Sequence, residues 1–172
     1  MRLFIAFRVP ADTLLPLQEK ITAEGVKLAH EFHCTLKFLS EVAEEHIPRI
    51  IGRLKTISFH PFSLHFSEIG AFPALQNIRV LWTGLQPEKP IIALQQQIED
   101  VLETFFPKNE HFTTHVTLAR LTHMEDEHSF KTIVHQLKIE PEEFVVSEFI
   151  LFKSELQGDK HIYSVVERFS SS

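Results

Sequence analysis

The sequence is poor in cysteine and glycine, and each scarcity excludes a kind of site. Cys34 is the single cysteine among 172 residues, which excludes an internal disulfide and a zinc site built from cysteines. There are five glycines, and neither GxGxxG nor GxxxxGKS/T occurs. The chain therefore lacks the glycine-rich loops that hold nucleotide phosphates in many α/β enzymes.

Long apolar runs are absent as well. No stretch approaches the ~20 consecutive apolar residues that a membrane-spanning helix needs. The first apolar segment reaches Pro10 and Asp12 too soon for a secretory signal peptide. We therefore expect a cytoplasmic protein that contacts no membrane. We also expect it to act as a monomer with no obligate protein partner.

Basic residues are outnumbered, with 17 Lys and Arg against 23 Asp and Glu and a formal net charge of −6. Such a balance argues against broad binding of nucleic acid, which requires a basic surface. It still permits recognition of one phosphate in a locally positive cleft. Sixteen Phe residues, against one Trp and one Tyr, predict a substantial apolar core.

The order of predicted elements repeats along the chain. Alternation and helical spacing predict strands at 2–9, 31–40, 62–69, 78–85, 114–121, 143–152 and 161–169, and helices at 12–24, 44–57, 88–106 and 125–137. The pairs of strands without a helix between them favour antiparallel neighbours. We therefore expect an α+β fold with two pseudo-symmetric lobes of antiparallel sheet, helices on the outside and an active-site cleft between the lobes. Residues 1–172 would form a single bilobal domain.

One short motif occurs twice, as HCTLKFL beginning at His33 and as HVTLARL beginning at His115. In a strand, residues i and i+2 project to the same face. His33 and Thr35 therefore share a face, and His115 and Thr117 do the same. If a pseudo-twofold axis brings the two polar faces together, one cleft holds two imidazoles and two hydroxyls.

This set of groups suits cleavage of a phosphodiester without a metal. A neutral His can remove a proton from the attacking water while a protonated His gives one to the departing oxygen. Histidine titrates near ~6.5, so both forms are accessible at neutral pH. The Thr hydroxyls can donate hydrogen bonds to the non-bridging oxygens of the phosphate.

Two alternatives compete with this interpretation. A single HxTL in a strand is more often structural, and it is the second copy that favours a site. Eleven His residues also suggest a metal, but HEFH at 30–33 lacks HExxH spacing and no third ligand accompanies His111 and His115. We expect neither a metal nor another cofactor.

The paired motifs resemble those of the two-histidine (2H) phosphoesterase superfamily. The segments RLFIAF, HCTLKFLSEV, GAFPALQNIRVLW, HVTLARL and SEFILFKSEL with the later YSVVERF resemble, in order, the RNA 2′,3′-cyclic phosphodiesterases, also called 2′-5′ RNA ligases or LigT-like proteins. The resemblance covers nearly the whole chain. It implies metal-independent hydrolysis of RNA or oligonucleotide ends that carry a 2′,3′-cyclic phosphate, leaving a 2′-phosphate, with reversible 2′-5′ RNA ligation as a further capacity.

The resemblance also implies roles for individual residues. His33 and His115 match the two catalytic histidines, and Thr35 and Thr117 match the phosphate-binding threonines. His115 would activate water while His33 protonates the leaving O3′. From the residues alone, the two roles are interchangeable.

Three residues inside the motifs are candidates for substrate contact. Phe38 and Arg120 resemble a nucleobase clamp, with a ring on one side and a guanidinium on the other. Strict alternation would place both away from the histidines, so the clamp requires a β-bulge or a strand end to intervene. Lys37 has the parity of His33 and is expected in the cleft.

Weaker candidates lie outside the motifs. Arg79 and Lys153 could add positive charge, although a solvated or structural role is the expectation for each. GAFP at 70–73 is predicted to be a turn that shapes the rim of the cleft.

Three functions remain open at this point. The chain could be an RNA 2′,3′-cyclic phosphodiesterase, an enzyme acting on a small cyclic phosphate such as that of ADP-ribose or on 2′-5′ oligoadenylate, or a non-catalytic module that binds nucleotides or RNA ends. The two intact histidines disfavour the third, because binding alone does not require two proton-transfer groups. The rim of the cleft would distinguish the first two.

Overall fold

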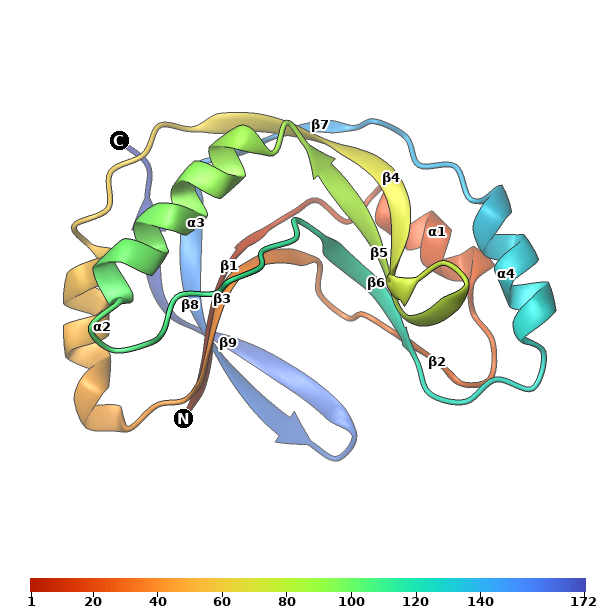
Figure 1. Ribbon diagram of the computed structural model, residues 1–172, viewed down its shortest axis with the longest axis horizontal. Helices are drawn as coiled ribbons and strands as arrows, with labels where there is room; N and C mark the ends of the chain where they lie inside the picture. The colour runs from red at the N-terminus through yellow and green to blue at the C-terminus, as the bar shows by residue number, and fades with distance from the viewer.

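The computed structural model describes residues 1–172 and shows an α+β fold, with nine strands in one sheet and four α-helices packed outside it (Figure 1). The strands are β1 (Arg2–Arg8), β2 (Val26–Leu28), β3 (His33–Glu41), β4 (Phe62–Ala74), β5 (Asn77–Gln86), β6 (Val116–Leu121), β7 (Glu143–Val146), β8 (Glu148–Gln157) and β9 (Lys160–Ser170). The helices are α1 (Leu14–Lys20), α2 (Ile47–Leu54), which follows a 3₁₀ turn η1 (Glu44–His46), α3 (Lys89–Leu102) and α4 (Glu127–Gln136).

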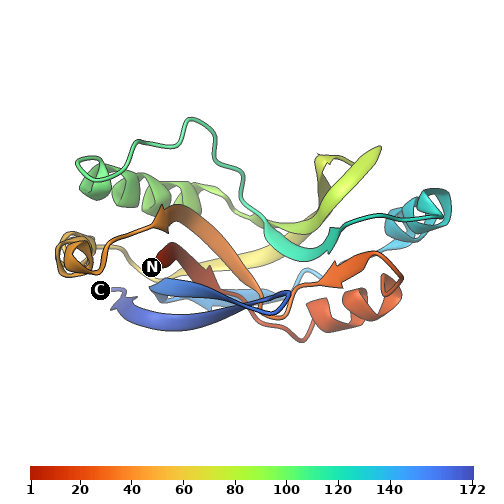
Figure 2. The same ribbon diagram turned by 90° about the horizontal axis from the view of Figure 1, so that it is seen from below.

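All strand pairs are antiparallel, and the order across the sheet is β7-β4-β5-β6-β3-β1-β8-β9, with β2 added beside β6. Strands β3 and β6 are joined at one Cα pair, Cys34 with Val116. The expectation of two separate sheets is therefore wrong, because this junction makes the two halves continuous. Helices α2 and α3 lie at one end of the elongated molecule and α1 and α4 at the other (Figures 1 and 2).

The predicted strand 143–152 is in fact two strands. β7 and β8 are separated by Ser147, and they lie far apart in the order of the sheet, where β7 pairs with β4 and β8 pairs with β1. Each half of the sheet thus draws on distant parts of the chain. Periodicity could not reveal the break, because both pieces have the composition of a strand. The three-residue strand β2 has no counterpart among the predicted elements.

GAFP at 70–73 belongs to β4 and is not the predicted turn. The strand can continue here because Gly70 accommodates the indole of Trp82, its partner on β5. A Cβ atom on Gly70 would come within 2.4 Å of the Trp82 ring. The sequence feature interpreted as a turn therefore marks a close approach of a ring to the backbone.

Strand β1 is buried on both of its faces. Leu3, Ile5 and Phe7 belong to the main apolar core under the helices. Phe4 and Ala6 face the other way and form a smaller apolar cluster with Ile150 and Phe152 of β8. His33 of the β3 motif packs against the Phe4 and Phe152 rings of this second cluster.

None of the helices is both long enough and apolar enough to cross a membrane.

Candidate active site

The two copies of the motif meet where β3 pairs with β6. The junction of Cys34 with Val116 places the start of both strands at the middle of the sheet. A groove of ≈ 830 Å³ lies there, and the four motif residues line it: His33, Thr35, His115 and Thr117. The predicted convergence of two imidazoles and two hydroxyls on one cavity is therefore what the fold produces.

His33 is held among aromatic rings. Its imidazole centroid is 5.2 Å from that of Phe4, 6.3 Å from that of Phe152 and 5.4 Å from that of Tyr163, the last in an edge-to-face arrangement. No hydrogen bond to protein holds either ring nitrogen. The ring is therefore oriented by packing, and both nitrogens remain available to a ligand.

This apolar environment shifts the titration of His33. Burial lowers the pKa of His33 from 6.5 to about 4, and the positive charges of His115, Arg120 and Arg8 act in the same direction. His33 is consequently neutral at pH 7 when no anion lies beside it. An anionic phosphate beside it would raise its pKa, because the opposite charge favours the imidazolium.

His115 has a different arrangement. Phe72 contacts it edge-to-face at 4.9 Å and Trp82 lies 6.1 Å away, measured between ring centroids. Its Nδ1 lies 2.9 Å from the carbonyl oxygen of Thr113, which can only accept, so Nδ1 carries the proton. The neutral ring therefore has a free lone pair on Nε2. Burial lowers the pKa of His115, the hydrogen bond to Thr113 opposes that effect, and Arg120 lowers the pKa further.

A β-bulge in β3 decides which residues after Thr35 face the groove. Ala6 pairs with Thr35 and Ile5 pairs with Lys37, so Leu36 is the extra residue of the bulge. Lys37 consequently turns into the core, where it is 2% exposed. The prediction that Lys37 lines the cleft is wrong, because the bulge inverts the alternation on which it depended.

The same bulge brings Phe38 to the groove. Its side chain is 64% exposed and is part of the groove wall. A second bulge occurs at the equivalent place in β6, where Trp82 pairs with Thr117 and Leu81 pairs with Ala119. Arg120 then lines the groove as well. Both members of the predicted clamp therefore lie in the same cavity as the histidines.

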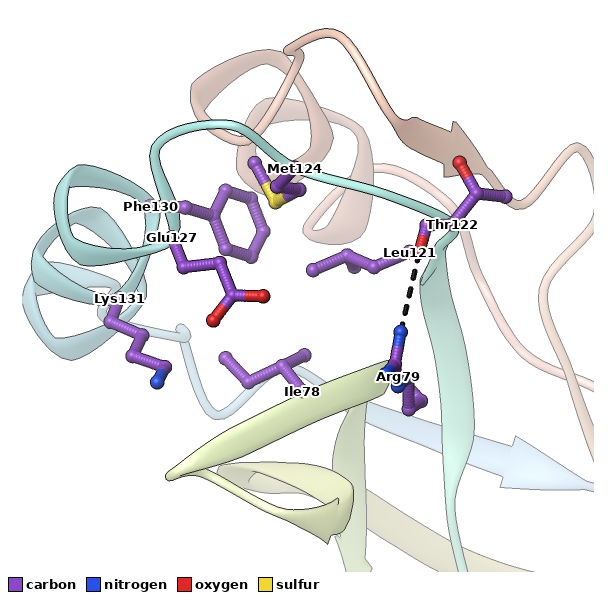
Figure 3. Close-up of a pocket in the computed structure, with 8 residues that line it drawn as sticks. All are labelled: Ile78, Arg79, Leu121, Thr122, Met124, Glu127, Phe130 and Lys131. Atoms are coloured by element: carbon purple, nitrogen blue, oxygen red, sulfur yellow. Dashed lines mark hydrogen bonds between the residues drawn. The ribbon is translucent and has the colours of Figure 1, made fainter.

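The two weaker candidates lie outside the groove. Arg79 is exposed, donates from Nη1 to the carbonyl oxygen of Thr122 at 3.3 Å, and lines a small cavity of ≈ 20 Å³ below α4 (Figure 3). Lys153 forms an ion pair with Glu155 at 2.7 Å. Neither side chain therefore adds its charge to the wall of the groove.

Sequence reasoning missed part of the groove wall. Arg2, Lys27, Lys160 and Tyr163 also line it. They come from β1, β2 and β9, and no motif or spacing links them in the sequence. No group of three or more His, Cys, Asp or Glu side chains is arranged to hold a metal ion.

Comparison with known sequences identifies relatives over the whole chain. Residues 16–158 match the family model of the 2′-5′ RNA ligase superfamily. The RNA 2′,3′-cyclic phosphodiesterase of Methanocaldococcus jannaschii is 28% identical over 98% of this chain and 100% of its own length. The RNA 2′,3′-cyclic phosphodiesterase of Archaeoglobus fulgidus is 34% identical over 70% of this chain and 73% of its own.

Solved structures show the same architecture. TT0787 of Thermus thermophilus superposes with a TM-score of 0.83 at 26% identity, covering 99% of this chain and 97% of its own. E. coli LigT complexed with 3′-AMP has a TM-score of 0.78 at 24% identity, covering 99% and 98%. The fold described above is thus a LigT-like fold.

Proposed function

The chain belongs to the 2′-5′ RNA ligase superfamily, and we propose that it is an enzyme that hydrolyses the 2′,3′-cyclic phosphate at RNA ends to a 2′-phosphate. The observation that supports this most is the convergence of His33, Thr35, His115 and Thr117 on one groove. The names of its relatives state the same activity for those proteins. The whole chain would act as one bilobal unit, with the groove between its two halves.

In the proposed mechanism, the Nε2 lone pair of His115 removes a proton from water. The water oxygen attacks phosphorus, the P–O3′ bond breaks, and His33 donates a proton to O3′ as it leaves. The phosphate remains on O2′. His115 ends protonated and His33 neutral, and proton exchange with solvent restores the starting state.

The physical environment of each ring fits its role. The Thr113 carbonyl holds the proton of His115 on Nδ1, which leaves Nε2 to act as the base. Burial and the nearby positive charges lower the pKa of His33 to about 4, and the negative charge of a bound phosphate opposes that shift, so the substrate itself favours the protonated ring that a general acid requires. Thr35 and Thr117 would donate hydrogen bonds to the non-bridging oxygens, where negative charge accumulates in the transition state.

Phe38 and Arg120 are proposed to hold the terminal base. An exposed phenyl ring offers a stacking surface, and such stacking is typically worth ~1–3 kcal/mol per base. The guanidinium of Arg120 can stack on the other face of the base or pair with the phosphate.

The test is a panel assay on purified protein in the presence of EDTA. It would offer RNA ending in a 2′,3′-cyclic phosphate, a 2′-5′ dinucleotide and an ADP-ribose cyclic phosphate, and ³¹P NMR would locate the phosphate in each product. We expect hydrolysis of the RNA end to a 2′-phosphate that persists in the chelator. A 3′-phosphate product, or activity abolished by EDTA, would contradict the mechanism.

A further inference from the structure

The groove concentrates positive charge in an acidic protein. Four of the 17 Lys and Arg residues line it, but only two of the 23 Asp and Glu residues do. The cations are Arg2, Lys27, Arg120 and Lys160, and the carboxylates are Glu31 and Asp159. The remaining surface repels polyanions, so a polyanion is steered to this groove.

The backbone of Lys27 lies away from the place where a phosphate would be held between the histidines. It is paired with Arg120 across β2 and β6, and Arg120 is three residues further along β6 than Thr117. At ~3.3 Å per residue, that places Lys27 about 10 Å along the strand from the phosphate site. The groove therefore has cationic side chains that a single cyclic phosphate does not need.

The ion pair that Lys27 makes is easily replaced. Its Nζ lies 4.0 Å from Oδ2 of Asp159 in the turn between β8 and β9, and both side chains are more than half exposed. An exposed pair of this kind contributes little, typically ~0–1 kcal/mol. Lys160, the first residue of β9, directly follows Asp159, so an incoming phosphate would meet two cations and displace one weakly held carboxylate.

Building on the proposed function, we propose that Lys27 and Lys160 form a second phosphate subsite in the wall of the groove. Lys27 and Lys160 hold a backbone phosphate of a nucleotide on the 5′ side of the cyclic phosphate. A 2′,3′-cyclic mononucleotide has no such phosphate and cannot use them. The two lysines would therefore distinguish an RNA strand from a cyclic mononucleotide.

The experiment compares two substrates and two variants. A 2′,3′-cyclic mononucleotide and an oligoribonucleotide ending in a 2′,3′-cyclic phosphate would be given to the wild type, to Lys27→Met/Lys160→Met and to Lys138→Met. Lys138 is exposed and lies outside the groove, so it controls for the loss of one surface charge. Anisotropy with a labelled oligonucleotide bearing a 2′-phosphate would measure binding without turnover.

We expect the double variant to lose about tenfold in kcat/KM and in affinity for the oligonucleotide, with the mononucleotide and the Lys138→Met control unchanged. The slope of log affinity against log salt should fall by about one for each phosphate that the variant no longer binds. Equal losses on both substrates, or no loss on the oligonucleotide, would overturn the proposal. If neither substrate is hydrolysed but the oligonucleotide binds as described, the proposed function fails and the binding site stands.

A second inference comes from a different observation, the buried ion pair behind β3. Lys37 Nζ lies 2.7 Å from Oε2 of Glu99 and donates to the carbonyl oxygen of Pro107 at 3.0 Å. Glu99, which is 5% exposed, also accepts from Gln95 Nε2 at 2.9 Å and from the backbone N–H of Asn109 at 3.4 Å. The charges are thus paired inside the core and are joined to the chain beyond α3.

That chain is the segment 107–115, which crosses from α3 to the start of β6 without regular secondary structure (Figure 2). It carries His115 and is attached to β3 at both ends. Lys37 holds Pro107 at one end, and Cys34 pairs with Val116 at the other. Both attachments come from the strand that carries His33.

We propose that Lys37, paired with Glu99, is a positioning residue that holds this segment so that His115 faces the same phosphate as His33. The test uses Lys37→Met/Glu99→Gln, which removes both charges and the hydrogen bond to Pro107 but keeps an acceptor for Gln95. Leu54→Ala, a core change in α2, is the matched control for reduced stability.

We expect the double variant to lose at least about tenfold in kcat with KM within twofold, because small displacements of a reacting group are costly. The ring resonances of His115 should shift in the NMR spectra of the double variant. At a temperature where Leu54→Ala is folded, that control should change neither kcat nor these resonances. Unchanged kcat and unchanged resonances would overturn the proposal. If the double variant does not fold, Lys37→Arg replaces it in the experiment. This variant keeps the positive charge but moves the hydrogen-bond donor, and the same losses in kcat and shifts of the His115 resonances are expected.

Discussion

Leu36 and Leu118 are bulge residues at the same place in the two copies of the motif. Each is buried together with the residue that follows it, Lys37 or Ala119. The next residue, Phe38 or Arg120, then faces the groove. The two copies therefore share the bulge in the backbone as well as the His and Thr side chains. They differ in the side chain that the bulge turns into the groove, which is Phe38 in β3 and Arg120 in β6.

The two histidines should be separable by the leaving group of the substrate. Either His→Ala variant should lose about 10²–10⁴-fold in kcat/KM on an ordinary cyclic phosphate. A substrate whose bridging 3′-oxygen is replaced by sulfur expels a thiolate that needs no proton. Single-turnover rates on this substrate should be largely restored for His33→Ala and not for His115→Ala. The reverse pattern would exchange the acid and the base, and restoration of neither would remove His33 from the role of acid.

The activity should have its optimum on the acid side of neutrality. Burial lowers the pKa of both histidines, that of His33 to about 4, so the form with one charged and one neutral ring is most populated below pH 6.5. As pH rises above this window both rings become neutral, and as pH falls both become charged. A bell-shaped profile of kcat/KM with its maximum below pH 6.5 is expected. A maximum above pH 7 would contradict the lowered pKa values in the free enzyme.

Phe38 should contribute to affinity and not to chemistry. Its exposed ring offers a base a stacking surface worth ~1–3 kcal/mol, so Phe38→Ala should raise KM roughly 5- to 150-fold and leave kcat within a few-fold. Leu15→Ala, which truncates an exposed apolar side chain on α1, is the control and should change neither constant. A fall in kcat at constant KM would instead place Phe38 in the support of the histidines.

Gly70 should not tolerate a side chain. A Cβ there would lie 2.4 Å from the indole of Trp82, which in turn lies beside His115. Gly70→Ala should lower the free energy of unfolding by ~1–3 kcal/mol through overpacking and reduce kcat by displacing the rings around His115.

Gly52 is the control for Gly70, because a side chain at this position should raise the free energy of unfolding and not lower it. A Cβ on Gly52, on the exposed face of helix α2, has nothing within 4 Å, so Gly52→Ala should raise the free energy of unfolding by ~0.5–1 kcal/mol. Urea unfolding of both variants checks the pair. Equal effects of the two substitutions would show that the packing of Gly70 against Trp82 is not tight.

Most of the regular elements and the chemistry of the motif could be predicted from the sequence. The strand that begins at His33 and the strand β6 that directly follows His115 both follow from alternation, although β6 begins at Val116, two residues later than predicted. The helices follow from apolar spacing, although α1 ends at Lys20, earlier than predicted. These features depend on residues close in the chain, and local patterns are sufficient for them.

The sequence by itself determined that two His–Thr faces exist and that they can perform acid–base chemistry on a phosphate. Tertiary structure decided that they meet, through the single pairing of Cys34 with Val116. It also sent Lys37 into the core and Phe38 into the groove, and it added Lys27 and Lys160 to the wall. The physical reason is that bulges and strand neighbours are set by hydrogen bonds between segments distant in the chain, which the local alternation of side chains does not record.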